Sequence, residues 1–172
     1  SNVNRMAPIL AALGGRAAAE LTVVSDSQDF IRFEEFEEGS IRYVPWSVQN
    51  EKACLASADV GVSPIEDNPW NRGKSGFKTM LYMACGLPSV SSPVGSITQV
   101  VQHGQNGFFA GSREEWIRAL KDLGADERFS AQIGGRARRT IVEKYSAAVL
   151  YPQFKQALMG SGVMRSASLA AS

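Results

Sequence analysis

Short apolar runs alternate along most of this chain with longer stretches in which apolar residues recur every three or four positions. The short runs are typical of buried strands and the longer stretches of amphipathic helices. Strands are predicted over residues 20–25, 41–46, 59–64, 89–91 and 108–110. Helices are predicted over 6–13, 47–58, 75–84, 97–102, 112–124 and 126–141, with a last one from 146 onward. This alternation predicts an α/β fold, a Rossmann-like open parallel sheet with helices on both faces.

Local signals set the ends of these elements. Ser47, Ser75 and Asp126 are predicted helix caps, and Ser112 with Glu115 matches a capping box. We expect a single domain over 1–160 and a disordered tail over 161–172. The polar stretch 26–39 is compatible with a helix or an irregular excursion. Pro152 predicts a kink or a break in the last helix.

The stretch from Ala58 to Ser96 organises the chain, because it reads as strand, loop, helix, strand, loop and the start of another helix. Such a βαβ unit implies a parallel sheet, in which ligands bind beyond the carboxyl ends of the strands. The loops 68–76 and 92–96 are expected at that edge. Each leads into a helix N-terminus, whose free N–H groups suit a phosphate.

The segment GKSGFKTMLYMACGLPSVSSPVG, residues 73–95, resembles the donor-site segment of retaining glycosyltransferases of the GT-B type, the glycosyl transferases group 1. The resemblance continues through residues 59–61 upstream and 103–109 downstream, and covers 4–158 in all. It implies the C-terminal, donor-binding domain of an enzyme that transfers a hexose from a UDP- or GDP-type sugar to a glycan or lipid acceptor with retention, without a cofactor. It also implies a missing N-terminal acceptor domain or separate subunit, a cytoplasmic location, peripheral membrane association through that missing half, and an inactive isolated chain.

The residues expected to bind the donor follow from this segment. They are Lys74, Ser75, Gly76, Phe77 and Lys78 at a helix start, Gly95 and Ser96 at a second loop, and Trp46 and Ser47 where the resemblance places the base. Backbone N–H groups, a hydroxyl and two ammonium groups suit a leaving diphosphate. The structural alternatives are a capping serine, packing glycines, solvated lysines, a plain turn and a core tryptophan. His103 is expected to be structural or exposed, and no catalytic residue is assigned.

The chain departs from the family at a pair of glutamates that lie eight positions apart. Gly73 and Leu81 occupy those places, and a leucine cannot accept a hydrogen bond from ribose. Glu66 or Asp67 could substitute for the first glutamate if their loop folds inward. Two other hypotheses therefore stay open: a degenerate, non-catalytic GT-B module that binds or regulates a partner, and an unrelated Rossmann-like phosphate or nucleotide binder.

Composition narrows the remaining classes of function. The net charge of +1 gives no electrostatic case for nucleic acid, and 44% apolar residues are ordinary for a globular protein. No apolar run reaches the ~20 residues that span a bilayer. Cys54 and Cys85 are expected to be small buried hydrophobes, and one His with two scattered Cys predicts no metal site. The acidic residues between 34 and 38 are expected to form a solvated face.

Overall fold

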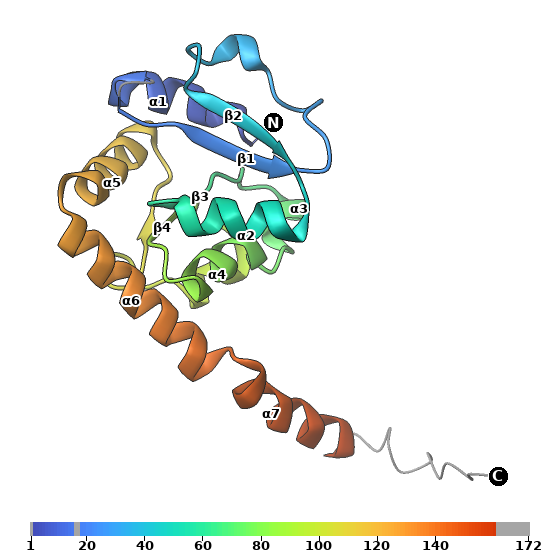
Figure 1. Ribbon diagram of the computed structural model, residues 1–172. Coiled ribbons are helices and arrows are strands. Elements are labelled where there is room, and N and C mark those ends of the chain that lie inside the picture. Colours follow the sequence, from blue (N-terminus) through green and yellow to red (C-terminus); the bar gives the residue numbers. More distant parts are fainter. Residues whose placement is uncertain (1, 16–17, 161–172) are drawn as a thin grey trace.

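The computed structural model describes residues 2–15 and 18–160 of the 172-residue chain (Figure 1). The predicted tail over 161–172 lies outside the described residues. The first half contains η1 (Asn4–Met6), α1 (Ala7–Leu13), β1 (Leu21–Ser25), η3 (Phe33–Glu35), β2 (Ile41–Pro45), α2 (Val48–Ser57) and β3 (Gly61–Ser63). The second half contains α3 (Pro69–Arg72), α4 (Phe77–Ala84), β4 (Ser89–Ser91), η4 (Gly95–Gln99), β5 (Phe108–Phe109), α5 (Arg113–Ala125), α6 (Glu127–Lys144) and α7 (Ala147–Gly160). None of the described helices has the length and apolar character needed to cross a membrane.

All strand pairs in the described residues are parallel, and helices lie on both sides, which confirms the predicted fold class. The strands form two hydrogen-bonded sheets, β1-β2 and β3-β4-β5, instead of one continuous ladder. Apolar packing joins the two sheets, since Val23 of β1 and Val62 of β3 belong to one core cluster.

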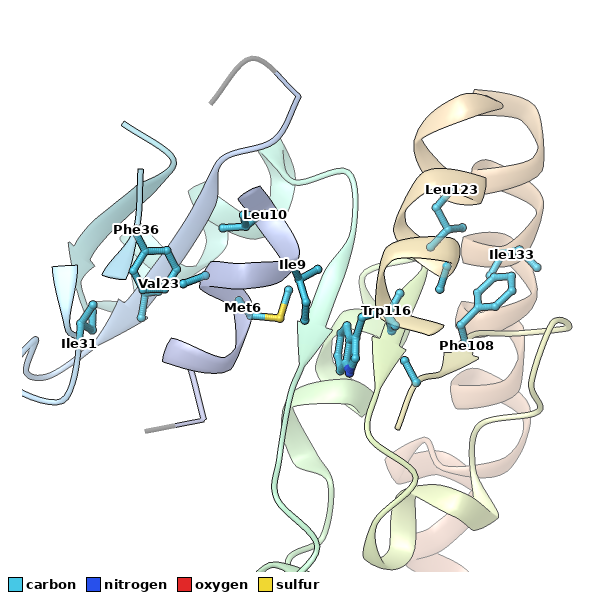
Figure 2. Packing of buried hydrophobic residues seen from close by; sticks show 14 residues of the cluster. Met6, Ile9, Leu10, Val23, Ile31, Phe36, Phe108, Trp116, Leu123 and Ile133 are labelled. Carbon is cyan, nitrogen blue, oxygen red and sulfur yellow. The ribbon is translucent and has the colours of Figure 1, made fainter. Parts of the chain in front are cut away.

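The central strands present different side chains to their two faces, because successive residues of a strand alternate. Val62 and Val90 belong to the cluster that also contains residues of α1 and α5, and Figure 2 shows Ile9 of α1 beside Trp116 of α5. The opposite face is covered by α4. There Ser91 and Thr79 share a hydrogen bond of 2.9 Å between their hydroxyl oxygens.

Two glycines permit this close packing of α4. A Cβ on Gly61 would overlap the ring of Tyr82, and a Cβ on Gly134 of α6 would overlap the carbonyl oxygen of Gly86. The guanidinium of Arg138 donates from Nη1 to the carbonyl oxygen of Ala84 at 2.9 Å. The C-terminal end of α4 is therefore fixed against α6.

Local structure follows most of the sequence signals. Ser47 and Asp126 cap their helices, and Ser112 with Glu115 forms the full capping box, as predicted. The polar stretch 26–39 is irregular with one 3-10 turn, and its glutamates are exposed. The short helix expected over 97–102 is a 3-10 turn at Gly95–Gln99.

Some of the predictions for this part of the chain were wrong. The loop expected at 68–73 contains the helical turn α3, because Asn68 Oδ1 accepts from the Asn71 N–H at 2.9 Å and Pro69 fits the first turn. The helix α7 continues through Pro152, which is exposed, so the break predicted there as one of two outcomes is wrong, and the kink stays a prediction. Cys85 is exposed because it caps the C-terminal end of α4, while Cys54 is partly buried.

Candidate functional site

The candidate site lies where β3, β4 and β5 end. These strands are parallel, so their carboxyl ends meet at one edge of the sheet. The loops that follow are tied together there by hydrogen bonds. The Ser92 N–H donates to the Ser63 carbonyl, and Ser92 Oγ accepts from the Ile65 N–H, both at 3.1 Å.

Two loops predicted to share this edge are in direct contact. The hydroxyl of Ser96 donates to the carbonyl oxygen of Lys74 at 3.1 Å. Gly95 has a φ of 70° and lies so near α3 that a Cβ on it would be 2.8 Å from the Arg72 carbonyl oxygen. A Cβ on Gly76 would likewise be 3.0 Å from the Cβ of Ile97. The expected meeting of the two loops is thus confirmed, and the binding roles of their residues stay a prediction.

The start of α4 is open to a ligand. Gly76 is its N-cap residue with a φ of 66°, and no described side chain caps the helix. By contrast, side chains cap α2, α3, α5 and α6. The first N–H groups of a helix have no partner within it, and they carry about half a positive charge. The edge therefore offers an anion several free donors.

The side chains around the start of α4 do not all have the positions or roles that were predicted. Ser75 was predicted to cap α4, but glycine takes that position because the backbone enters the helix through the left-handed region. Phe77, one of the residues expected to bind the donor, is 68% exposed. Lys74, Ser75 and Lys78 are also exposed, so their polar groups are available at the surface.

Trp46 and Ser47 lie at the end of β2, apart from the contacts just described. Trp46 is 50% exposed, which makes the alternative of a core tryptophan wrong. The backbone N–H of Trp46 donates to the Ser25 carbonyl oxygen at 3.0 Å, while Ser47 Oγ accepts from the backbone N–H of Asn50. No described hydrogen bond joins this pair to Lys74 or to Ser96. In Figure 1, β1 and β2 run toward the side of the molecule where α3 lies.

The two acidic candidates near Gly73 have different surroundings. The carboxylate of Asp67 accepts from Arg72 at 2.6 Å and 3.0 Å, and this pairing lowers the pKa of Asp67. Glu66 instead lines an open hollow beside α3. Neither leucine nor glycine carries a carboxylate, and in the structure Leu81 is partly buried while Gly73 is exposed.

His103 has a structural role. Its Nδ1 accepts from the Phe109 N–H at 3.0 Å, and its ring lies edge-on to Phe108. Among the described residues no three His, Cys, Asp or Glu side chains gather as a metal site would require.

Sequence reasoning missed the lining of the hollow beside α3, above all Arg5, Trp70 and Asn71. The signal was present in the Asn-Pro-Trp-Asn stretch at 68–71, where an N-cap residue precedes a proline. That pattern predicts a helical turn, which presents Trp70 to solvent.

The profile of the family described as Glycosyl transferases group 1 matches residues 3–126. A curated relative, N-acetyl-alpha-D-glucosaminyl L-malate synthase of Bacillus anthracis, is 32% identical over 79 residues, which cover 42% of this chain and 20% of the relative. The chain therefore spans about a fifth of that relative's length.

Solved structures share the fold. HepE of Anabaena, in complex with UDP and glucose, gives a TM-score of 0.74 at 19% identity over 88% of this chain and 44% of its own. Sucrose-phosphate synthase of Thermosynechococcus elongatus gives a TM-score of 0.79 at 18% identity, over 94% of this chain and 42% of the synthase. The C-terminal domain of the group 1 protein LpcC of Francisella tularensis gives 0.67 at 13% identity, over 83% of this chain and 78% of that domain.

Proposed function

The chain belongs to the glycosyl transferases group 1 family, and on this premise we propose that it is the C-terminal, donor-binding domain of a retaining glycosyltransferase. The reaction is transfer of a hexose from a nucleoside diphosphate sugar to a glycan or lipid acceptor. The observation that carries the proposal is the contact of Ser96 with Lys74, which sets the uncapped start of α4 beside η4. Family membership removes the alternative of an unrelated nucleotide binder.

The proposed role of this edge is to hold the diphosphate. Negative charge builds on the leaving nucleoside diphosphate during transfer, so fixed donors aimed at it act in the transition state. The free N–H groups of α4 and the ammonium groups of Lys74 and Lys78 supply such donors. Gly76 lets a phosphate approach the main chain closely because it has no side chain.

For the base, we propose stacking on Trp46, with Ser47 beside it. An indole that is half exposed at a strand end offers a flat apolar face to a base. Two HepE structures hold UDP-glucose or UDP with glucose, which supports a UDP-type donor. A GDP-type donor is the second candidate.

The acceptor is proposed to bind elsewhere, on a second domain or a separate subunit. The chain spans 44% of HepE and 42% of the sucrose-phosphate synthase. Without the acceptor held next to the donor, the gain from proximity is lost, so the isolated chain should turn over little substrate. A cytoplasmic location and peripheral membrane association through that other half are part of the same proposal.

A second candidate function is a non-catalytic module that binds or regulates a partner. Gly73 and Leu81 favour it, since neither side chain can accept a hydrogen bond from a sugar hydroxyl.

Calorimetric titration with UDP and with GDP tests the proposal. We expect weak binding of one of them, and a several-fold loss in Lys74→Ala and in Lys78→Ala. Lys121→Ala, an exposed lysine on α5, is the matched control and should bind as the unmodified chain does. Absence of binding by both nucleotides would reject the donor site and favour the non-catalytic module. Retention is checked on the assembled enzyme by the anomeric configuration of its product.

A further inference from the structure

The last two helices form an arm at the C-terminal end of the described chain. Helix α6 is packed against the end of α4 at Gly134, and α7 (Ala147–Gly160) continues from it away from the sheet, as Figure 1 shows. Most of the described side chains of α7 are exposed to solvent. The arm therefore has a surface that a partner can cover.

Large apolar side chains gather on one face of α7. Leu150, Tyr151 and Phe154 are all exposed, the last two to 66% and 62%. Residues that are three or four positions apart share one face of a helix, so these three side chains form an apolar stripe. Exposed apolar groups that gather on one face indicate an interaction site, whereas scattered ones need no such explanation.

Basic side chains accompany this apolar stripe. Residues 136–160 contain one acidic residue, Glu143, and five basic residues: Arg136, Arg138, Arg139, Lys144 and Lys155. The rest of the chain has more acidic than basic residues, because the totals are 17 acidic and 18 basic. The five basic side chains are exposed, and none forms an ion pair within the part of the chain that the structure describes. The arm thus concentrates positive charge.

An apolar stripe next to basic side chains is typical of a helix that lies on an anionic lipid surface. Lys155 directly follows Phe154, and its aliphatic stem can lie along apolar surface while the ammonium group reaches the lipid phosphates. Aromatic and aliphatic side chains of such a helix enter the boundary between headgroups and acyl chains.

A second copy of the chain fits this surface less well. Between Ala147 and Gly160 there is no acidic residue, so two α7 helices would bring Lys155 of one copy near basic groups of the other without a counter-charge. Like charges repel, whereas a lipid surface that carries phosphate groups attracts each basic residue of the arm.

We propose that α7 and the last turns of α6 form a membrane-docking arm, which lies on an anionic lipid surface with the apolar stripe of α7 in the interface. The inference goes beyond the proposed function and does not rest on it. It adds a contact from this chain to the membrane association proposed for the other half of the enzyme. A lipid acceptor would then be reached from the surface on which the arm lies.

Vesicle flotation of the 172-residue chain tests the proposal. The two kinds of vesicle are phosphatidylcholine alone and an equal mixture of phosphatidylcholine and phosphatidylglycerol. We expect binding to the anionic vesicles to be at least about tenfold stronger than binding to the neutral ones. Added salt should weaken it, because salt screens the attraction between the basic side chains and the lipid phosphates.

Two double variants separate the apolar and the charged contributions. Tyr151→Ser with Phe154→Ser removes most of the stripe, and Arg139→Gln with Lys144→Gln removes two charges. Each pair should weaken binding to anionic vesicles about tenfold. Arg138 is left unchanged because it holds the end of α4.

Matched controls carry the same changes elsewhere on the surface. Phe33→Ser replaces an exposed aromatic residue on η3, and Arg118→Gln with Lys121→Gln removes two exposed charges from α5. Both controls should bind vesicles as the unmodified chain does. Urea unfolding checks that all variants remain folded.

Several results would overturn the docking arm. They are no binding to anionic vesicles at low salt, and equal binding by the arm variants and their controls. A dimer in sedimentation velocity that Tyr151→Ser with Phe154→Ser abolishes, without vesicle binding, would give the stripe to a second copy. In the assembled enzyme, slow hydrogen exchange in α7 that vesicles do not change would mean that another domain covers it. Titration with UDP and GDP is read separately, so either proposal can fail alone.

Discussion

The hydroxyl of Ser96 donates a 3.1 Å hydrogen bond to the carbonyl oxygen of Lys74. This one contact joins two loops that are 22 residues apart and that follow different strands. Because the Lys74 carbonyl is held, the peptide groups that lead into α4 have a fixed direction. The contact thus sets the orientation of the free donors at the start of that helix.

Ser96→Ala should therefore weaken nucleoside diphosphate binding about fivefold, which corresponds to about 1 kcal/mol. The free energy of unfolding should change by no more than about 1 kcal/mol, because a single exposed hydrogen bond is lost. Calorimetry and urea unfolding measure the two effects. Ser57→Ala removes a similar hydroxyl-to-carbonyl bond of 3.3 Å at the end of α2 and is the control for the binding measurement. Equal binding by both variants would contradict the role given to Ser96.

Gly61→Ala should destabilise the fold by about 2 to 3 kcal/mol, since the new methyl group would overlap the ring of Tyr82. Denaturant unfolding measures this loss. Gly124→Ala on α5 is the matched control, because apart from its chain neighbours and the backbone of its own helix no atom lies within 4 Å of its Cβ position. That variant should gain about 0.5–1 kcal/mol from reduced backbone freedom. A similar loss in both variants would mean that the packing of α4 on β3 is looser than described.

The phenol of Tyr82 should lose its proton at a higher pH than an ordinary tyrosine does. Burial, and to a smaller extent the charge of Glu51, raises the pKa of Tyr82 from 10.0 to about 12. Since the folded state prefers the neutral phenol, its contribution to stability is complete below pH 10 and is lost as the pH rises toward 12. An ultraviolet titration of the chain should show a late step that belongs to Tyr82. Tyr82→Phe should abolish that step, and a titration curve unchanged by the substitution would refute the assignment.

Glu115 should make the free energy of unfolding depend on pH in the acidic range. Its Oε2 accepts from the N–H groups of Gly111 and Ser112 at 2.7 Å and 3.0 Å, which holds the pKa of Glu115 below the ordinary 4.5. A lowered pKa contributes stability above pH 4.5, and this is lost as the pH falls through the folded value. Unfolding measured between neutral pH and pH ~3 should show a smaller acid loss in Glu115→Gln. Glu114→Gln, the adjacent exposed carboxylate, should keep the loss seen in the unmodified chain.

The fold and the meeting of the two loops could be predicted because both follow from local patterns. Parallel strands joined by helices force their carboxyl ends to one edge, so Lys74 and Ser96 had to lie on the same side. The helix caps at Ser47 and Ser112 could also be predicted from the sequence, since a capping side chain forms its hydrogen bond within its own turn.

The features that could not be predicted depend on packing between distant segments. Phe77 keeps helical spacing with Met80, yet the spacing alone does not tell that its side chain is 68% exposed. The hollow beside α3 needs Arg5 and Trp70 together, which are 65 positions apart in the sequence. The single ladder expected for the sheet is replaced by apolar contact between β1 and β3, which periodicity cannot distinguish from pairing.

The packing of Gly134 on Gly86, with Arg138 bound to the Ala84 carbonyl, anchors the C-terminal end of α4 to α6. Its last turn is clamped to the long helix α6, and its eight residues project from that clamp toward the sheet edge. The other end of α4 is tied to Ser96 through the Lys74 carbonyl, so this short helix is held at both ends. A side chain at position 134 would displace Gly86 at the end of α4, and we expect the displacement to reach the start of the helix, where we propose that the diphosphate binds.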